Sequence, residues 1–196
     1  MFDLLYPSDP APRLPRPTFS NPGIQTVEAE ELLPIIEPGG LVIGQATRSY
    51  CHSGSKLLHP VVHLHLVDRE GRIYLQKRAD TKDLLPGYWD TAVGGHVSYG
   101  ESILEALYRE TGEELGLTAF NPVFLEAYRW ETARDNEFVC VFAAVGHPVL
   151  DPDPAEVSDG RWWTPEEIDA AVGKDILTPN FAHEFGRIRD RLAALL

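Results

Sequence analysis

The chain has 196 residues, of which 43% are hydrophobic and 24% charged, a composition typical of a globular protein and not of a disordered one. Its length predicts one domain, or one domain plus an appendage. Lysine and arginine number 17 against 30 acidic residues, and the formal net charge of −13 excludes the basic surface that binds a nucleic-acid polymer.

The sequence also indicates where the protein works. Two cysteines, Cys51 and Cys140, are too few for a disulfide framework and suggest a reducing compartment. No apolar run approaches the roughly 20 residues that cross a bilayer, and the first residues lack the pattern of a signal peptide. We therefore expect a cytoplasmic protein that has no membrane partner.

Residues 1–38 contain eight of the sixteen prolines and predict an N-terminal arm, with the main domain at residues 39–196. Proline fixes φ and removes a backbone donor, so residues 7–22 are expected to be extended. A short helix is expected at residues 27–33. Two roles are left open for the arm: covering the site, or pairing with a second subunit in a homodimer.

From Leu41 onward the sequence predicts regular structure. Residues 41–43, 61–67 and 73–76 are rich in β-branched and apolar residues and predict strands, the last two joined as a hairpin. Residues 80–89 predict a charged loop. The pair Gly94-Gly95 then allows another group to approach the backbone closely.

The second half of the chain continues with a helix expected at residues 101–115, followed by Gly116 where a helix commonly ends. Strands are expected at 123–130 and 138–145, and an acidic loop at 151–159. Two more helices are expected, one starting at Thr164-Pro165 and one over 181–195. This order predicts an α+β protein with a mixed β-sheet sandwiched between α-helices.

The helix at 101–115 brings three carboxylates together. At about 100° per residue, Glu110, Glu113 and Glu114 fall within an arc of roughly 100°, next to an apolar stripe. Like charges at this spacing repel, and Gly112 costs the helix about 1 kcal/mol relative to alanine. A divalent cation would offset both costs, and oxygen ligands favour Mg²⁺ or Mn²⁺. On spacing alone, a solvated acidic face explains the cluster equally well.

The longer string from Gly95 to Leu117 separates these interpretations. It matches the pattern GX5EX7REUXEEXGU, where U is aliphatic, except that Thr111 replaces one aliphatic residue. The chain therefore resembles the Nudix family. The resemblance implies a mixed sheet between helices and an enzyme that hydrolyses a diphosphate linked to another moiety. The matching residues are Gly95, Glu101, Arg109, Glu110, Glu113, Glu114, Gly116 and Leu117.

The resemblance also implies roles for these residues. Glu110 and Glu114 match the principal metal ligands, and Glu113 matches a further ligand or the base that activates water. The carbonyl of Gly94 matches a backbone ligand of the metal. The pair that orients the helix and its loop matches Arg109 and Glu101.

A second set of residues is similar to the isopentenyl-diphosphate isomerase branch of this superfamily. The segment 89–102, WDTAVGGHVSYGES, carries that branch's Trp, Gly-His and Gly-Glu-Ser at matching spacings. Three histidines and two acidic residues surround a metal in that branch, and they match His52, His59, His96, Asp135 and Glu137. Residues that hold the substrate diphosphate match Arg78 and Lys82. Tyr128 stands near this set, and two interpretations are kept for it: packing or substrate contact.

One departure favours hydrolysis over isomerisation. The isomerases have a catalytic cysteine two residues before the histidine that matches His96, and this chain has Gly94 there. Moving an allylic double bond needs an acid and a base on opposite faces of the substrate, and Gly94 leaves one face without a group. All the carboxylates of the hydrolase pattern are present, and the base is either Glu113 or Glu137.

Three functions remain as hypotheses. The first is an Mg²⁺-dependent (or Mn²⁺-dependent) hydrolase of a small nucleoside or other organic diphosphate. The second is an isomerase-like enzyme that works without the thiol, and the third is a non-catalytic ligand sensor on the same fold. The remaining histidines fit no pattern and are expected to be structural or surface residues; they are His63, His65, His147 and His183.

Overall fold

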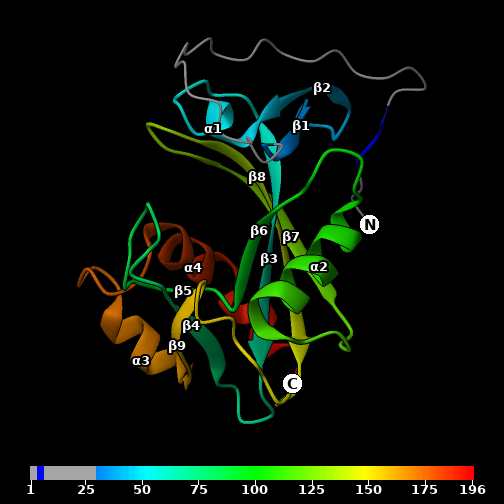
Figure 1. The fold of residues 1–196 in the computed structure, drawn as a ribbon. Coiled ribbons are helices and arrows are strands. Elements are labelled where there is room, and N and C mark those ends of the chain that lie inside the picture. The colour runs from blue at the N-terminus through cyan, green and yellow to red at the C-terminus, as the bar shows by residue number, and fades with distance from the viewer. Residues whose placement is uncertain (1–3, 7–29) are drawn as a thin grey trace. The chain divides into compact units, whose positions relative to one another are not determined.

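The structure is a computed structural model that describes residues 4–6 and 30–196 (Figure 1). The extended arm predicted at residues 7–22 lies outside these ranges. The described chain runs through β1 (Leu32–Ile36), β2 (Val42–Thr47), α1 (Arg48–Cys51), β3 (His59–Val67), β4 (Ile73–Arg78), β5 (Trp89–Asp90), β6 (Val93–His96), α2 (Ile103–Leu115), β7 (Val123–Glu131), β8 (Asn136–Val145), β9 (Val157–Trp163), α3 (Pro165–Ala171) and α4 (Pro179–Ala193). This combination of sheet and helices confirms the α+β class.

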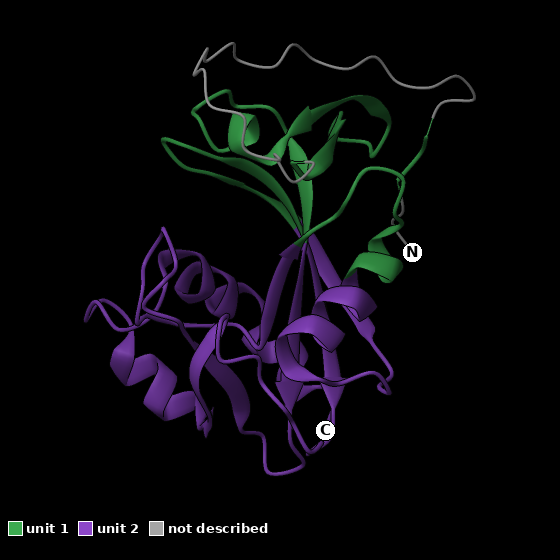
Figure 2. Ribbon diagram, in the orientation of Figure 1, with its two compact units in different colours: residues 1–61, 96–106, 128–139 green, residues 62–95, 107–127, 140–196 purple. Residues whose placement is uncertain are grey.

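The chain divides into two compact units, each assembled from three separate segments (Figure 2). Unit 1 comprises residues 1–61, 96–106 and 128–139, and unit 2 comprises residues 62–95, 107–127 and 140–196. Strands β3 and β8 each contribute residues to both units. The boundary predicted at residue 38, between an arm and a domain, stays a prediction.

Strands β1 and β2 form the small antiparallel sheet of unit 1, with Leu33 opposite Ala46. Both side chains are buried in a cluster with Ile35 and Cys51. Because β1 begins at Leu32, the helix predicted at residues 27–33 is wrong in its described part. Leu33 precedes a proline, and the residue before proline is disfavoured in the helical conformation.

Helix α2 begins with a reciprocal cap in unit 1. The backbone N–H of Ser102 donates to the Glu105 carboxylate at 2.8 Å, and the Glu105 N–H donates to the Ser102 hydroxyl at 3.3 Å. Two backbone donors at the helix start are thereby satisfied. The helix therefore starts at Ile103, two residues after the predicted start.

The other end of α2, in unit 2, is where the sequence predicts it. Gly116 has φ +63° and donates to the carbonyl of Gly112 at 3.1 Å, which closes the helix. Thr111 is fully buried, and its hydroxyl donates to the carbonyl of Leu107 at 2.6 Å. The threonine that departs from the Nudix pattern therefore packs like an aliphatic residue with its hydroxyl satisfied.

The larger sheet has the strand order β5-β4-β3-β8-β7, with β6 paired to β3 and β9 paired to β4. Strand β9 was not predicted, because Asp159-Gly160 is a typical turn sequence within an expected acidic loop. The structure gives this glycine another reason: a Cβ at Gly160 would overlap the hydroxyl of Tyr74 on the neighbouring strand β4. Close approach of a side chain, not a turn, requires the glycine.

Helix α3 starts at its predicted cap, Thr164, whereas α4 starts at Pro179, two residues before the predicted start. Thr164 and Glu167 form a capping box at α3, and the Thr178 hydroxyl caps α4. The buried face of α4 is apolar except for one fully buried glutamate, Glu184. Within the described residues, no helix is both long and apolar enough to span a membrane.

Candidate functional site

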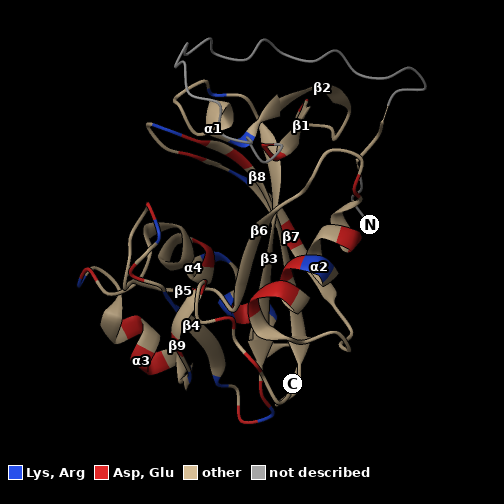
Figure 3. Cartoon of the chain, in the orientation of Figure 1, with Lys and Arg blue, Asp and Glu red and all other residues tan. Residues whose placement is uncertain are grey.

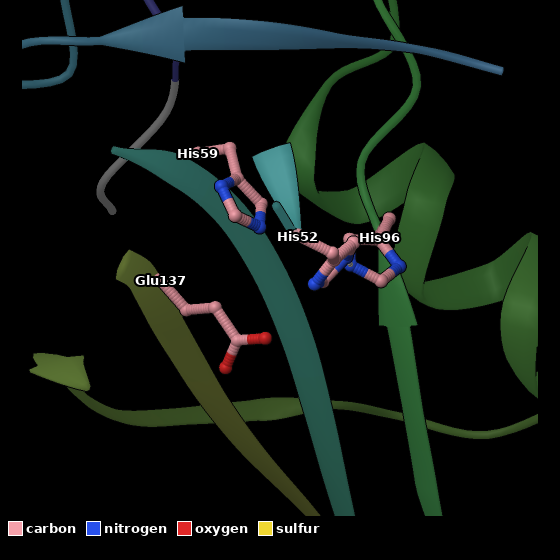
Figure 4. A group of neighbouring side chains, drawn as sticks. All are labelled: His52, His59, His96 and Glu137. Carbon is pink, nitrogen blue, oxygen red and sulfur yellow. Dashed lines mark hydrogen bonds between the residues drawn. The ribbon is translucent and has the colours of Figure 1, made fainter. Parts of the chain in front are cut away.

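Four side chains of unit 1 converge in what we call the histidine cluster: His52, His59, His96 and Glu137 (Figure 4). They come from the residue after α1, the first residue of β3, the last residue of β6, and β8. One ligand atom from each lies within 4.8 Å of the others. The structure therefore brings together four of the five residues that the isomerase resemblance groups around a metal.

The fifth, Asp135, lies behind this group and contacts His52. Its Oδ1 is 2.5 Å from His52 Nδ1, while the other nitrogen of His52 is 2.9 Å from His96 Nε2. Thr132 donates to the second carboxylate oxygen of Asp135 at 3.3 Å. A carboxylate on the far nitrogen of a histidine fixes the ring and its tautomer, as it does behind many metal-binding histidines.

His59 has the chemistry of a metal ligand. Its Nδ1 donates to the carbonyl of Leu57 at 2.9 Å, so Nε2 carries the lone pair. That Nε2 is buried and has no hydrogen-bond partner among the described residues. Burial lowers the pKa of His59 to about 4, so the ring is neutral at neutral pH. A neutral, unsatisfied imidazole facing a carboxylate fits a transition-metal ion.

The carboxylates of α2 in unit 2 form a different kind of site. Glu114 is 7% exposed and accepts hydrogen bonds from the side chain of Gln76, at 2.9 Å, and from the backbone N–H of Gly94. Burial raises its pKa to about 7; the bond from Gln76 opposes this shift and the charge of Glu110 adds to it. The ionised form is therefore costly unless a cation compensates it.

Glu110 lies against the glycine pair that precedes α2. A Cβ on Gly95 would overlap the carboxyl group of Glu110, so only glycine leaves that space. Arg109 donates to Glu110 at 2.9 Å and to Glu113 at 3.1 Å. The Glu113 side chain is 61% exposed against 13% for Glu110. Figure 3 shows the resulting acidic character of α2. Buried oxygen ligands beside a backbone strand fit a hard divalent cation.

The residues predicted to contact substrate are already engaged. Arg78 donates to the carbonyl of Leu84 at 3.1 Å and lies 3.4 Å from Asp90, and Lys82 is paired with Glu156. A diphosphate would have to exchange with these acids. Tyr128, in unit 1, is buried at 7% exposure.

Sequence reasoning missed two buried polar contacts of unit 2. One is the bond from Gln76 to Glu114, and the other joins Glu184 of α4 to His63 and His65 of β3. The two histidines are two positions apart on the strand, so their side chains point to the same face, which is a signal for a shared partner. No pattern marked that partner, because Glu184 lies 121 residues from His63.

Comparisons with known proteins agree with this fold and donor set. The model of the NUDIX domain family matches residues 57–181. A protein of Clavibacter sepedonicus described as an isopentenyl-diphosphate Delta-isomerase is 34% identical over 148 residues, which cover 72% of this chain and 78% of that protein. A protein of Escherichia coli strain K12 described as an uncharacterized Nudix hydrolase, YfcD, is 33% identical over 150 residues, which cover 76% of this chain and 82% of YfcD.

The fold is also found among solved structures. The crystal structure of DR0079 from Deinococcus radiodurans has a TM-score of 0.70 and 25% identity, and the match covers 80% of this chain and 98% of that one. The predicted α+β Nudix fold, a mixed sheet with several helices, is therefore confirmed. The chain belongs to the Nudix hydrolase family.

Proposed function

We propose that this protein is a hydrolase that depends on Mg²⁺ or Mn²⁺ and cleaves the phosphoanhydride of a small-molecule diphosphate linked to another organic moiety. The arrangement of Glu110 and Glu114 carries the proposal. Both carboxylates lie against the β6 backbone, one at Gly95 and one on the Gly94 N–H, and burial makes the charge of Glu114 costly. A sequence keeps such a pair when a cation offsets the cost.

In this mechanism Glu110, Glu114 and the carbonyl of Gly94 would hold the cation, and Gln76 fixes the orientation of the Glu114 carboxylate. When bound, the cation neutralises the diphosphate and acidifies a water molecule. Glu113 is exposed and held by Arg109, so it is placed to accept the proton of the attacking water. Glu137, the other base that the sequence leaves open, belongs to the histidine cluster of unit 1.

We further assign the histidine cluster to a second cation. Three imidazoles and one carboxylate favour an ion such as Zn²⁺, Fe²⁺ or Ni²⁺, whereas the oxygen ligands of α2 favour the harder Mg²⁺ or Mn²⁺. Asp135 bonds to the far nitrogen of His52, so in this assignment it orients a ligand. The neutral ring of His59 supports this assignment, because a protonated imidazole cannot bind a metal.

The proposal is tested with a panel of nucleoside-linked and prenyl diphosphates incubated with Mg²⁺ or Mn²⁺, with product phosphate as the readout. Glu114→Gln should lower kcat/KM about a hundredfold or more, because loss of an outer partner alone costs about 10–100-fold. Glu105→Gln is the matched control on the same helix and should keep the wild-type rate. Wild-type turnover in Glu114→Gln would contradict the assigned role.

Isomerisation is the second candidate, and the histidine cluster together with the isomerase-named relative favours it. Gly94 speaks against it, since the strand offers no thiol there. Incubation with isopentenyl diphosphate, followed by NMR, distinguishes the reactions. Formation of dimethylallyl diphosphate without release of phosphate would refute the hydrolase and support an isomerase. Ligand binding with no product from any substrate would instead favour a sensor.

A further inference from the structure

A cavity of about 360 Å³ in unit 2 is lined by residues of β4, of β9 and of the segment between β8 and β9. This volume is within the range of small-molecule sites, about 300–1,000 Å³. None of the lining residues belongs to the histidine cluster or to the carboxylates of α2, so the sites described above leave the cavity unexplained. Its walls include Tyr74, Leu150, Pro152, Val157, Asp159 and Gly160.

Tyr74 brings a buried hydroxyl to this cavity. The residue is 5% exposed, and its hydroxyl makes no hydrogen bond with any residue that the structure describes. A Cβ on Gly160, another wall residue, would overlap this hydroxyl, which places the polar end of the ring at the cavity wall. Burial raises the pKa of Tyr74 and the charge of Asp159 raises it further, so the hydroxyl keeps its proton at neutral pH. A buried hydroxyl without a partner is costly and marks a place for a polar ligand atom.

Asp159 adds a negative charge at the same wall. The residue is exposed, and its Oδ1 accepts a hydrogen bond from the N–H of Gly160 at 2.8 Å. A carboxylate repels a phosphate and accepts hydrogen bonds from N–H groups. The cavity therefore disfavours the diphosphate itself and favours an uncharged group that carries both a hydrogen-bond donor and an acceptor.

Two contacts connect the cavity to Glu114, the buried carboxylate of α2. Tyr74 and Gln76 are two positions apart on β4, so their side chains share one face at a spacing of about 7 Å. Gln76 lies opposite Gly160 of β9, and its amide donates to the Glu114 carboxylate at 2.9 Å. On the other side of the cavity, the N–H of Asp153 donates to the backbone carbonyl of Glu114 at 2.9 Å. A group bound in the cavity is therefore next to a candidate metal ligand.

From this placement we propose that the cavity binds the organic moiety of the substrate and that this moiety is a nucleobase with an amino group. The amino group donates to Asp159, and a ring nitrogen or carbonyl of the base accepts from the Tyr74 hydroxyl. The inference rests on the proposed function and narrows its substrate to nucleoside-linked diphosphates. Tyr74 and Asp159 then determine specificity, although both lie outside the Nudix pattern.

The cavity wall distinguishes a base from other organic moieties. Leu150, Pro152 and Val157 are apolar and suit the faces of a flat ring, which a sugar lacks. A prenyl chain suits the same side chains, but it carries no group that can bond to Tyr74 or Asp159. A site with polar groups discriminates against ligands that leave those groups unpaired. A nucleobase satisfies both kinds of wall.

The first test is an NMR titration of the wild-type protein with adenosine, cytidine and guanosine, which carry amino groups but no phosphate. At least one of them should shift the backbone amide signals of Asp159 and Gly160 in a saturable way. Tyr74→Phe and Asp159→Asn should each weaken that binding about fivefold or more, the effect of one lost hydrogen bond. Tyr108→Phe is the matched control and should bind like wild type, because this exposed tyrosine donates to the carbonyl of Phe120.

Two outcomes of this titration would overturn the proposal. One is the absence of any shift at Asp159 and Gly160 with all three nucleosides, a result that needs no variant and stands even if Tyr74→Phe fails to fold. The other is an equal response to glucose, which would show that the cavity does not distinguish a base from a sugar.

Turnover gives a second measurement, in which the two proposals fail separately. With a nucleoside-linked diphosphate as substrate, Tyr74→Phe should raise KM about fivefold with kcat little changed, while KM for a prenyl diphosphate stays the same. Nucleoside binding without hydrolysis of any diphosphate would refute the hydrolase and keep the nucleobase site. Hydrolysis of a nucleoside-linked diphosphate with an unchanged KM in Tyr74→Phe and Asp159→Asn would refute the nucleobase site and keep the hydrolase.

Discussion

At the scale of single residues, Gln76 has the most direct link to the candidate ligands. Its amide donates to Glu114 at 2.9 Å, and its carbonyl oxygen is buried with no partner among the described residues. We expect Gln76→Leu to weaken Mn²⁺ binding about tenfold, because outer partners orient ligands. Electron paramagnetic resonance of free Mn²⁺ measures this without turnover. Gln45→Leu, at a buried glutamine on β2, is the matched control. Equal Mn²⁺ affinities of the two variants would show that Gln76 does not support the metal ligands.

Cys51 gives a second prediction at this scale. Burial raises its pKa to about 12, with help from the charges of Asp135 and Glu30. Because the thiolate is the reactive form, the folded protein should not react with iodoacetamide at Cys51, and the protein unfolded in guanidinium should. Mass spectrometry of the modified peptide measures both. Rapid alkylation in the folded state would show that a thiolate is available after all.

At the scale of elements, the contacts of Glu184 on α4 with His63 and His65 on β3 predict how the stability of the fold depends on pH. The folded-state pKa of Glu184 lies below the ordinary value of 4.5, so this group stabilises the fold above that pH and loses its contribution as the pH falls. The unfolding free energy of wild type should therefore decline more steeply below about pH 4.5 than that of Glu184→Gln. Urea unfolding at several pH values gives both slopes.

The control for this experiment is Glu70→Gln, an exposed turn residue whose side chain is 69% accessible. It should follow the wild-type slope. Parallel curves for wild type and Glu184→Gln would mean that the histidines do not favour the ionised carboxylate.

Elements with strong local signals could be predicted from the sequence. Helix α2 has its Glu pattern and Gly116, and α3 has Thr164-Pro165, so both were found. Strand β9 was not, because its Asp-Gly pair is typical of a turn. Strand β1 was not, because a short helix was expected over its first residues, although Pro34 disfavours that conformation.

The candidate site, too, could be predicted from the sequence only where its residues follow a local pattern. The carboxylates of α2 follow a spacing that can be read along one helix. The bonds from Gln76 to Glu114 and from His63 to Glu184 join residues 38 and 121 positions apart. Such pairs depend on how strands and helices pack, which no local pattern encodes.

At the scale of the whole molecule, two donor sets of different chemistry predict two ions. Cobalt(II) absorbs visibly at a nitrogen-rich site, so His59→Ala should abolish this absorption and leave Mn²⁺ binding intact. Glu114→Gln should do the reverse. His147→Ala, which removes a ring stacked on Trp162, is the control and should change neither signal. Joint loss of both ions in either single variant would indicate one shared site.

The interleaving of the two units has a consequence for inheritance. Each unit is built from three stretches that alternate along the chain. A single recombination crossover would therefore join half of one unit to a foreign half, and neither unit can be copied into another gene as one block. The segments that carry the histidine cluster and the α2 carboxylates alternate along the chain, so a single block transfer cannot move one unit without part of the other.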